Sequence, residues 1–308
     1  MSTAGPGTPQ VEEVSDAIYA YIQPDGTWYI NNAGFIVGRA GVISVDTTST
    51  EARTHAYIDS IASVTKAPVR TVINTHHHGD HTYGNYLFTG ATIIAHEQTR
   101  QHVTAAGPPA NRGLLDDVEW GDVVLTPPFL TYEDGVTLWV DDLKVEVRHV
   151  GQAAHTTNDS IVWIPDRSVL FAGDLLFNGG MPYLMEGSIA GLIDVLKHVV
   201  RPLGAETIIA GHGPVAGPEL IDITLAYLTF VQDTARRMRE AGLTPMEAAL
   251  EIDLGEYASL TDPERIVANL YRAYSELDGA ENGALLDTVA IRKEMVAFNG
   301  GRPLTCHA

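Results

Sequence analysis

The sequence has almost no cysteine: one among its 308 residues, Cys306. A single cysteine excludes both an intramolecular disulfide and a structural zinc site built from several thiolates. The sequence also has no apolar run long enough to span a bilayer. Its first seven residues contain neither the basic region nor the apolar stretch of a signal peptide. We therefore expect a protein of the cytoplasm without a membrane partner.

Positive charge is scarce as well. Lys and Arg together number 19 against 39 Asp and Glu, which gives a formal net charge of −20. A protein of this charge repels phosphate backbones, and the densest basic group is Arg236, Arg237 and Arg239. We therefore expect a small-molecule substrate and no nucleic-acid partner. The hydrophobic share of 45% is that of an ordinary folded protein.

Short β-branched runs separated by glycine occupy residues 17–217. They predict strands at 34–38, 42–46, 69–74, 91–95, 136–140, 143–150, 160–164, 169–172 and 207–210. Helices are expected between them at 50–64, 97–105 and 188–200. This alternation is typical of an α/β protein whose sheets are covered by helices. Residues 1–16 are small and polar, and we expect them to form a flexible N-terminal arm.

Residues 218–308 have a different pattern, with apolar residues at helical spacing and no evident strand. A capping Thr, a Pro and a Glu mark helix starts at 244–247 and at 261–264. One apolar stripe at helical spacing consists of Ile266, Leu270, Tyr274 and Leu277. Such a stripe must be buried against the rest of the chain or a partner. We expect a helical C-terminal extension that shapes the pocket rim and supports a homodimer.

The densest group of potential ligands follows the predicted strand at 69–74 and reads His76-His77-His78-Gly79-Asp80-His81. In an extended backbone His76 and His78 point the same way, whereas His77 points away and is expected to pack or meet backbone. Gly79 is expected to let the chain bend sharply, so that Asp80 and His81 reach the same volume. Imidazole and carboxylate ligands suit zinc, iron or manganese. A surface cluster or a tag is the alternative, but such a string rarely arises by chance and a tag lies at a terminus.

Three distant residues follow the same local pattern of an apolar run, a small residue and a potential ligand: His155, Asp174 and His212. Because strand ends at one edge of a layered sheet converge on one cleft, these side chains can meet the histidine-rich segment. The candidate metal ligands are therefore His76, His78, Asp80, His81, His155, Asp174 and His212.

In order and spacing, this set resembles the metallo-β-lactamase-fold superfamily over residues 17–217. The resemblance implies a four-layer αββα sandwich with a dinuclear metal site at one edge. It implies that a first ion is held by His76, His78 and His155, that a second is held by Asp80, His81 and His212, and that Asp174 bridges both. Asp80 and Asp174 are also the expected catalytic residues. Asp46 resembles the family's aspartate that orients the site, although it reads equally well as a turn residue.

The resemblance implies two divalent ions, with zinc favoured and iron or manganese as alternatives. It also implies hydrolysis by a dizinc-bound hydroxide. The sequence has no Gly-x-Ser-x-Gly elbow and no glycine-rich phosphate loop. We therefore expect a metal-dependent hydrolase of a small ester, lactone, thioester or amide. An iron-dependent redox enzyme of the dioxygenase or diiron type and a non-catalytic binding protein are the alternatives.

A β-lactamase with weak activity is a further alternative, but two departures argue against a typical one. Asp174 stands where the best-known zinc subclass carries cysteine, and Phe177 stands where it often carries a lysine for the antibiotic's carboxylate. A phenyl ring cannot make that charge-assisted contact. Substrate contacts are expected from the loops 23–32, 106–120 and 178–186. The larger apolar residues of these loops could either line a substrate pocket or pack in the hydrophobic core: Trp28, Tyr29, Trp120, Met181, Tyr183 and Met185.

Overall fold

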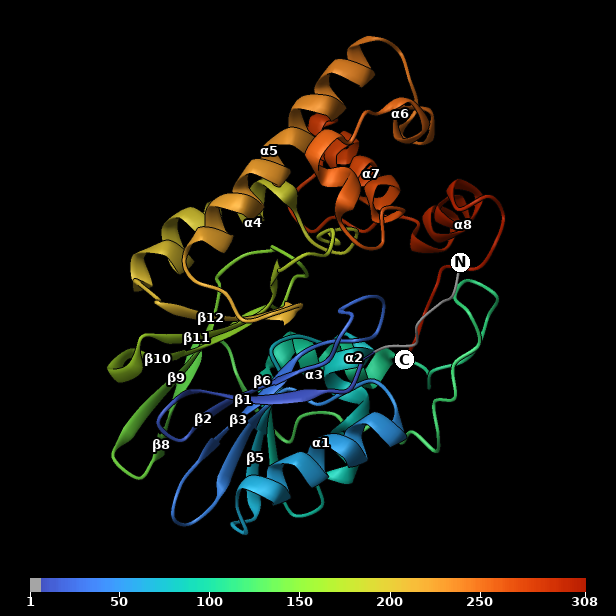
Figure 1. Ribbon diagram of the computed structural model, residues 1–308. Coiled ribbons are helices and arrows are strands. Elements are labelled where there is room, and N and C mark those ends of the chain that lie inside the picture. The colour runs from blue at the N-terminus through green and yellow to red at the C-terminus, as the bar shows by residue number, and fades with distance from the viewer. Residues whose placement is uncertain (1–6) are drawn as a thin grey trace.

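The computed structural model describes residues 7–308 and contains two β-sheets that lie face to face (Figure 1). The first sheet has the strand order β1 (Gln10–Ser15), β2 (Ile18–Ile22), β3 (Ala33–Val37), β4 (Val42–Val45), β5 (Val69–Ile73), β6 (Thr92–His96) and β7 (Leu130–Tyr132). The second has the order β12 (Thr207–His212), β11 (Val169–Phe177), β10 (Ser160–Ile164), β9 (Leu143–His149) and β8 (Gly135–Val140). All nine predicted strands are therefore present.

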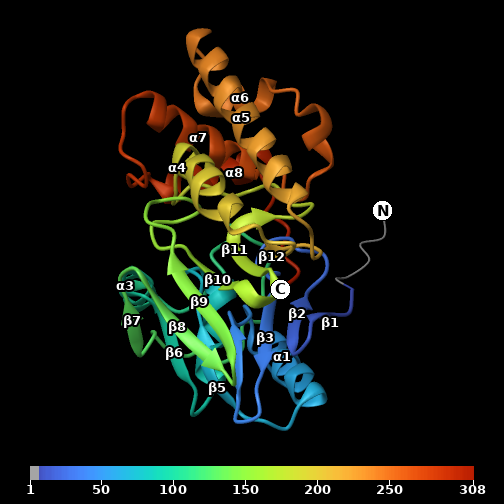
Figure 2. The same cartoon turned by 90° about the vertical axis from the view of Figure 1, so that its left-hand side faces the viewer.

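Helices cover the outer face of each sheet, as the view in Figure 2 shows. Strand β3 illustrates why: Phe35 packs outward against Tyr57 of helix α1 (Glu51–Val64), and the next residue, Ile36, lies between the sheets. Strand β10 alternates likewise between Val162 inside and Trp163 outside. The predicted four-layer αββα sandwich is confirmed.

The remaining elements connect the strands or follow the second sheet. They are α2 (Gly79–Thr82), η1 (Tyr83–Leu87), α3 (Glu97–Ala105), η2 (Pro165–Arg167), α4 (Ile189–Val195), η3 (Leu196–Val200), η4 (Arg201–Leu203), α5 (Glu219–Glu240), α6 (Pro245–Glu251), η5 (Gly255–Ser259), α7 (Arg265–Leu277) and α8 (Thr288–Phe298). No helix in residues 7–308 combines the length and apolar character that crossing a membrane requires.

Parallel pairing aligns the strand ends that carry candidate ligands. Strands β4, β5, β6 and β7 are mutually parallel, and β11 is parallel to β12. The carboxyl end of β5 therefore leads into the segment at 76–81, at the edge where the second half of β11 carries Asp174 and the end of β12 carries His212. The positions of these ligands follow from strand direction.

The prediction of a flexible N-terminal arm over residues 1–16 is wrong for residues 10–15. Residues 10–15 form strand β1, which pairs antiparallel with β2. The side chains of β1 are mostly exposed, so the segment has the polar composition of a loop although its backbone hydrogen bonds are those of a sheet edge. Residues 1–6 of the predicted arm lie outside the described residues.

The C-terminal extension is helical, and no strand occurs in its described residues. Helix α6 begins as predicted, with Thr244 and Glu247 forming a reciprocal capping box. Helix α7 begins at Arg265, later than the predicted start at 261–264. The reason is that Thr261 forms a β-bridge with Gly180, which holds the chain extended before the helix.

The apolar stripe of α7 packs within the chain itself. Ile266, Leu270 and Tyr274 belong to one hydrophobic cluster with the outer face of the second sheet, whereas Leu277 is exposed. This shared core joins the extension to the sandwich. The expected homodimer stays a prediction. The buried residues of the stripe are covered by the chain itself, so they do not require a second chain.

Candidate metal centre

The seven predicted ligands come from five chain segments and meet at one edge of the sandwich. His76 and His78 follow β5, Asp80 and His81 lie on α2, and His155 lies between β9 and β10. Asp174 lies inside β11, where the register shifts, and His212 ends β12. All are buried except His78, which is partly exposed.

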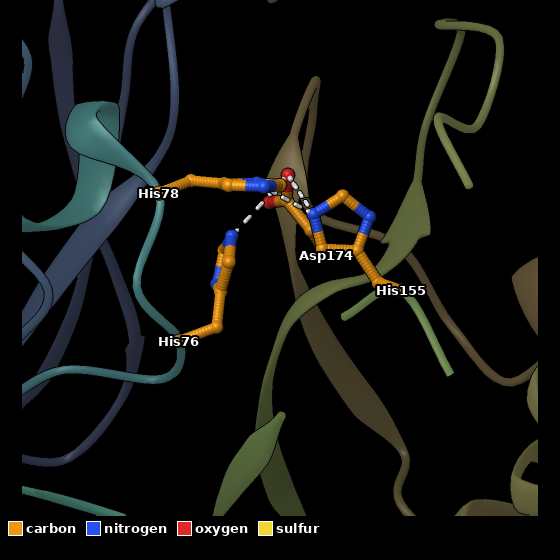
Figure 3. A group of neighbouring side chains, drawn as sticks. All are labelled: His76, His78, His155 and Asp174. Atoms are coloured by element: carbon orange, nitrogen blue, oxygen red, sulfur yellow. Dashed lines mark hydrogen bonds and ion pairs between the residues drawn. The ribbon is translucent and has the colours of Figure 1, made fainter. Parts of the chain in front are cut away.

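The first cluster consists of His76, His78, His155 and Asp174, whose side chains converge in Figure 3. His155 Nε2 lies 2.9 Å from His78 Nδ1 and 3.4 Å from Asp174 Oδ2. His76 Nε2 lies 3.9 Å from the same carboxylate oxygen. Three imidazole nitrogens therefore surround one carboxylate oxygen without a cysteine, which is a ligand set for a divalent ion.

The second cluster consists of Asp80, His81, Asp174 and His212. His81 Nε2 lies 3.0 Å from Asp174 Oδ1. His212 Nε2 lies 3.3 Å from Asp80 Oδ2 and 3.5 Å from Asp174 Oδ2. Asp174 thus contributes to both clusters, which is the arrangement that the family resemblance implies for a bridging carboxylate.

The ring nitrogens that face away from the clusters bond to fixed oxygens. His155 Nδ1 lies 2.7 Å from the Tyr183 carbonyl oxygen, and His212 Nδ1 lies 3.0 Å from the Gly26 carbonyl oxygen. A carbonyl oxygen can only accept, so each Nδ1 carries a proton, and Nε2 is the nitrogen of each ring that faces the cluster as a candidate ligand. Histidines that bind metals are commonly oriented in this way.

Asp46 contacts His81 directly and His76 through Thr75. From the sequence it could be either an aspartate that orients the site or a turn residue, and these contacts favour the first. Its Oδ2 lies 2.9 Å from His81 Nδ1 and accepts from the Thr75 hydroxyl at 2.8 Å. That hydroxyl lies 3.1 Å from His76 Nδ1 and can accept its proton. Asp46 has a φ of +60°, an uncommon conformation that places its carboxylate between Thr75 and His81.

The electrostatics of the clusters fit a cation. Burial lowers the pKa of His155 to about 3 and that of His76 well below its usual value, so both rings stay neutral as ligands must. Burial alone would raise the pKa of Asp174, but His81 and His212 hold it well below its usual range. Among the described residues, His76 Nε2 is one of the buried polar atoms without a hydrogen-bond partner. Such an atom is costly unless another group satisfies it, and a metal ion bound to this cluster would do so.

A third polar cluster, which the sequence did not suggest, adjoins the first. Glu186 Oε2 lies 3.3 Å from His77 Nε2 and 3.5 Å from His78 Nε2. Its other oxygen, Oε1, accepts from Arg292 Nη2 on helix α8 at 3.1 Å. His77 also stacks on His102 of α3. The stacking on His102 agrees with the expectation that His77 packs, but the contact with Glu186 was not expected.

Two glycines leave room for the centre. A Cβ at Gly211 would overlap Asp174 Oδ1, so the absence of a side chain on β12 allows the carboxylate to take its place. A Cβ at Gly79 would overlap the ring of Tyr83. The expected turn is present as helix α2, which begins at Gly79 and brings Asp80 and His81 to the second cluster. Gly79 does not have a positive φ, so the turn is not left-handed, and the glycine also makes space for Tyr83.

Two cavities lie beside the clusters. The inner one, of about 70 Å³, is lined by His78, Asp80, His155, Asp174 and His212, with Phe177 and Arg265 among its other walls. The outer one, of about 320 Å³, lies between the loop after α3 and helix α8. Four of the predicted pocket residues line it: Trp28, Tyr29, Trp120 and Tyr183. The other two, Met181 and Met185, belong to the hydrophobic core.

Phe177 takes the position at which a β-lactamase would place its lysine, and it has a different role here. Its ring stacks on His212 with ring centroids 4.9 Å apart. Arg265 also lies near this ring, with 5.2 Å from the guanidinium carbon to the ring centroid. The aromatic ring therefore forms an apolar wall of the inner cavity.

Comparison with known proteins gives the same assignment. Residues 26–212 match the family described as "Metallo-beta-lactamase superfamily". The chain is 23% identical to "Metallo-beta-lactamase type 2" of Bacteroides fragilis over 73% of this chain and 88% of that protein. It is 30% identical to "Hydroxyacylglutathione hydrolase" of Rhodospirillum rubrum over 46% and 47% of the two chains. A metallo-beta-lactamase structure from Pontibacter korlensis shares the fold at 19% identity, with a TM-score of 0.60 over 72% of this chain and 99% of that one. With this fold, the chain belongs to the metallo-beta-lactamase superfamily, and its buried clusters could hold metal ions.

Proposed function

We propose that this protein is a hydrolase that binds two divalent ions, with zinc favoured, and cleaves a small ester, lactone, thioester or amide. The observation that carries the proposal is the complete set of seven ligands, arranged as two clusters that share Asp174. Two ions held there supply a hydroxide nucleophile near neutral pH and stabilise negative charge that develops on the substrate.

The residues of the chain prepare the site for this chemistry. His76, His78 and His155 would hold the first ion, and Asp80, His81 and His212 the second. Asp174 directs Oδ2 toward the first set of histidines and Oδ1 toward His81. The hydrogen bonds from the outward ring nitrogens fix the orientation of the rings before an ion binds, which lowers the cost of ordering the site.

A metal analysis and a substrate panel test this proposal. Protein purified after growth with zinc is expected to carry about two ions per chain, as counted by plasma mass spectrometry. Esters, lactones, thioesters and amides are then assayed with and without a chelator, and at least one class is expected to show chelator-sensitive hydrolysis. A metal content near zero, or iron with its visible absorption and no hydrolysis, would overturn the proposal.

A typical β-lactamase activity is not part of the proposal. At the position where the best-known zinc subclass often carries a lysine for the carboxylate of the antibiotic, Phe177 supplies no cation, and its ring is engaged with His212 and Arg265. We expect turnover of β-lactams to be weak compared with that of the best substrate in the panel.

A further inference from the structure

Arg292 lies where the two cavities meet. It lines both the inner and the outer cavity, and it shares that position with Trp28, Tyr29 and Tyr183. It comes from helix α8 of the C-terminal extension, which lies on the same side of the molecule as the loop after α3 (Figure 1). A molecule that reaches the inner cavity through the outer one must pass this guanidinium.

The outer cavity has the opposite charge from the protein as a whole. The chain has 39 acidic and 19 basic residues. The described residues that line the outer cavity nevertheless include Arg112 and Arg292 and no Asp or Glu. The rest of the wall is mainly aromatic or aliphatic, as Trp120, Met295 and Leu304 illustrate. The wall therefore combines an apolar surface with two positive charges.

Arg292 is only partly engaged. Its Nη2 donates to Glu186 Oε1, and its guanidinium also lies against the Tyr183 hydroxyl. Its side chain is 42% exposed, so a ligand in the cavity can reach donors of the guanidinium. A guanidinium has five N–H donors in a planar fork that matches a carboxylate.

Arg265, the other arginine of the inner cavity, is already engaged. It is buried, and its Nη1 donates to the Met181 carbonyl oxygen. Its Nη2 pairs with Asp262 at 2.7 Å, and its guanidinium lies over the ring of Trp28. Arg265 is therefore enclosed by the protein, whereas Arg292, although it pairs with Glu186, is partly exposed and is the cation that a ligand can reach.

We propose that the substrate is a small amphiphilic anion, with an apolar body in the outer cavity and a carboxylate at Arg292. Arg112 adds a second, more exposed positive charge to the same wall. A cavity of about 320 Å³ is at the small end of those that hold small molecules, so the apolar body is compact. The site takes its cations from the extension and from the loop after α3, and Phe177 takes no part in binding the anion. This inference rests on the proposed function, because the bond that is cleaved is one that the proposed hydrolase would attack. Binding of the anion can be tested separately from cleavage.

The test uses two esters that differ in one charge: the 4-nitrophenyl monoester of suberic acid and its neutral methyl ester at the far carboxyl group. The metal-loaded enzyme is expected to prefer the anion by about tenfold or more in kcat/KM. Arg292→Gln is expected to abolish this preference, so that the two esters have about equal kcat/KM. Arg292→Lys is expected to keep part of the preference because the charge remains. Arg112→Gln is expected to reduce it by about two- to threefold, since an exposed charge is screened by solvent.

Arg236→Gln is the matched control, because it removes the same charge from an exposed position on helix α5 where Arg236 pairs with Asp233. Its preference is expected to equal that of the unaltered enzyme. An unaltered enzyme that treats the two esters alike, or an Arg292→Gln variant that keeps the full preference, would overturn the inference.

Binding without turnover separates this inference from the proposed function. Octanoate and octanol are titrated against the metal-loaded protein, with the fluorescence of Trp28 and Trp120 in the cavity wall as the readout. Tighter binding of octanoate that is lost in Arg292→Gln supports the anion site even if neither ester is hydrolysed, in which case the proposed hydrolase alone fails. Equal binding of the two ligands, or a preference that survives in Arg292→Gln, contradicts the anion site whatever the esters show.

Discussion

The inner and outer cavities share a wall but are built from different parts of the chain. The inner cavity is lined by ligands at strand ends of the sandwich, and their outward nitrogens are held by backbone carbonyls and by Asp46. The outer cavity is lined by the loop after α3, by helix α8 and by Leu304 near the C-terminal end. The candidate ligands therefore come from the strands and from the short segments that follow them, whereas the wall of the outer cavity depends mainly on segments outside the sheets.

This difference teaches where changes should have their effects. A substitution in the inner cavity should alter metal content and the rate with every substrate. A substitution in the outer cavity should alter the choice of substrate and leave the metal count unchanged. Glu186 is the exception, because it joins His78 on one side to Arg292 on the other.

The largest effect is expected at Asp174. Asp174→Ala removes a carboxylate from both clusters, so the second ion should bind weakly and kcat/KM should fall by about 10³-fold or more. Asp174→Asn should also lose metal affinity, because the amide has no negative charge. Metal counting and assays against a confirmed substrate measure both effects.

Asp166→Ala is the control for that change, because Asp166 is an exposed carboxylate just before β11, near the opposite end of the strand. It should keep two ions and normal turnover. If Asp174→Ala also kept both, the bridging assignment would be wrong.

Gly211→Ala tests how closely the sheet confines the bridging carboxylate. The new Cβ would overlap Asp174 Oδ1 and displace it, so we expect metal affinity to fall by about ten- to hundredfold while the protein remains folded. Competition with a chromophoric chelator measures the affinity, and circular dichroism the fold. Gly107→Ala is the matched control, since a Cβ there meets no atom within 4 Å. Equal affinities in the two variants would show that Asp174 is free to move.

Glu186→Gln tests the link between the two cavities. Glu186 lies 3.5 Å from His78 Nε2, and losing its charge should weaken one ion by about tenfold. The d–d spectrum of the cobalt-substituted protein should shift as well, because the position of His78 changes. The exposed Glu206 provides the control, Glu206→Gln. If Glu186→Gln leaves the cobalt spectrum and the metal affinity unchanged, Glu186 does not couple the two cavities.

The smallest effect on activity is expected at Cys306, which lies beyond the wall of the outer cavity. Its thiol is buried and donates to the Trp28 carbonyl oxygen, and burial raises its pKa to about 11. A raised pKa keeps the thiol protonated until the pH approaches that value. At about pH 8, a disulfide reagent should therefore react at least about a hundredfold more slowly with the native protein than with the denatured protein.

Cys306→Ser should change kcat/KM by less than about twofold, because it removes only one weak hydrogen bond. Rapid labelling of the native thiol would show that the C-terminal segment does not stay packed against Trp28.

The predictions made from sequence were best where the signal is local. The nine strands were found because β-branched runs between glycines are a property of a few neighbouring residues. Strands β1, β2 and β7 were missed: β1 lies at a sheet edge with exposed polar side chains, and β7 has only three residues. The helix start at 261–264 was misplaced because a distant partner, Gly180, keeps Thr261 extended. At this helix start a tertiary contact outweighed local propensity.

The sequence by itself determined the ligand types of the candidate centre, which are imidazoles and carboxylates. Four of these residues are closely spaced within 76–81, and the others follow runs that are recognisable as strands. Only the tertiary structure decided that Glu186 meets His78 and that Arg292 reaches the metal side of the molecule. Glu186 and Arg292 are 106 residues apart, and neither belongs to a local motif. A single carboxylate among 39 acidic residues has no signal of its own. Its role arises when the helical extension packs onto the sandwich, which happens through nonlocal burial of apolar surface.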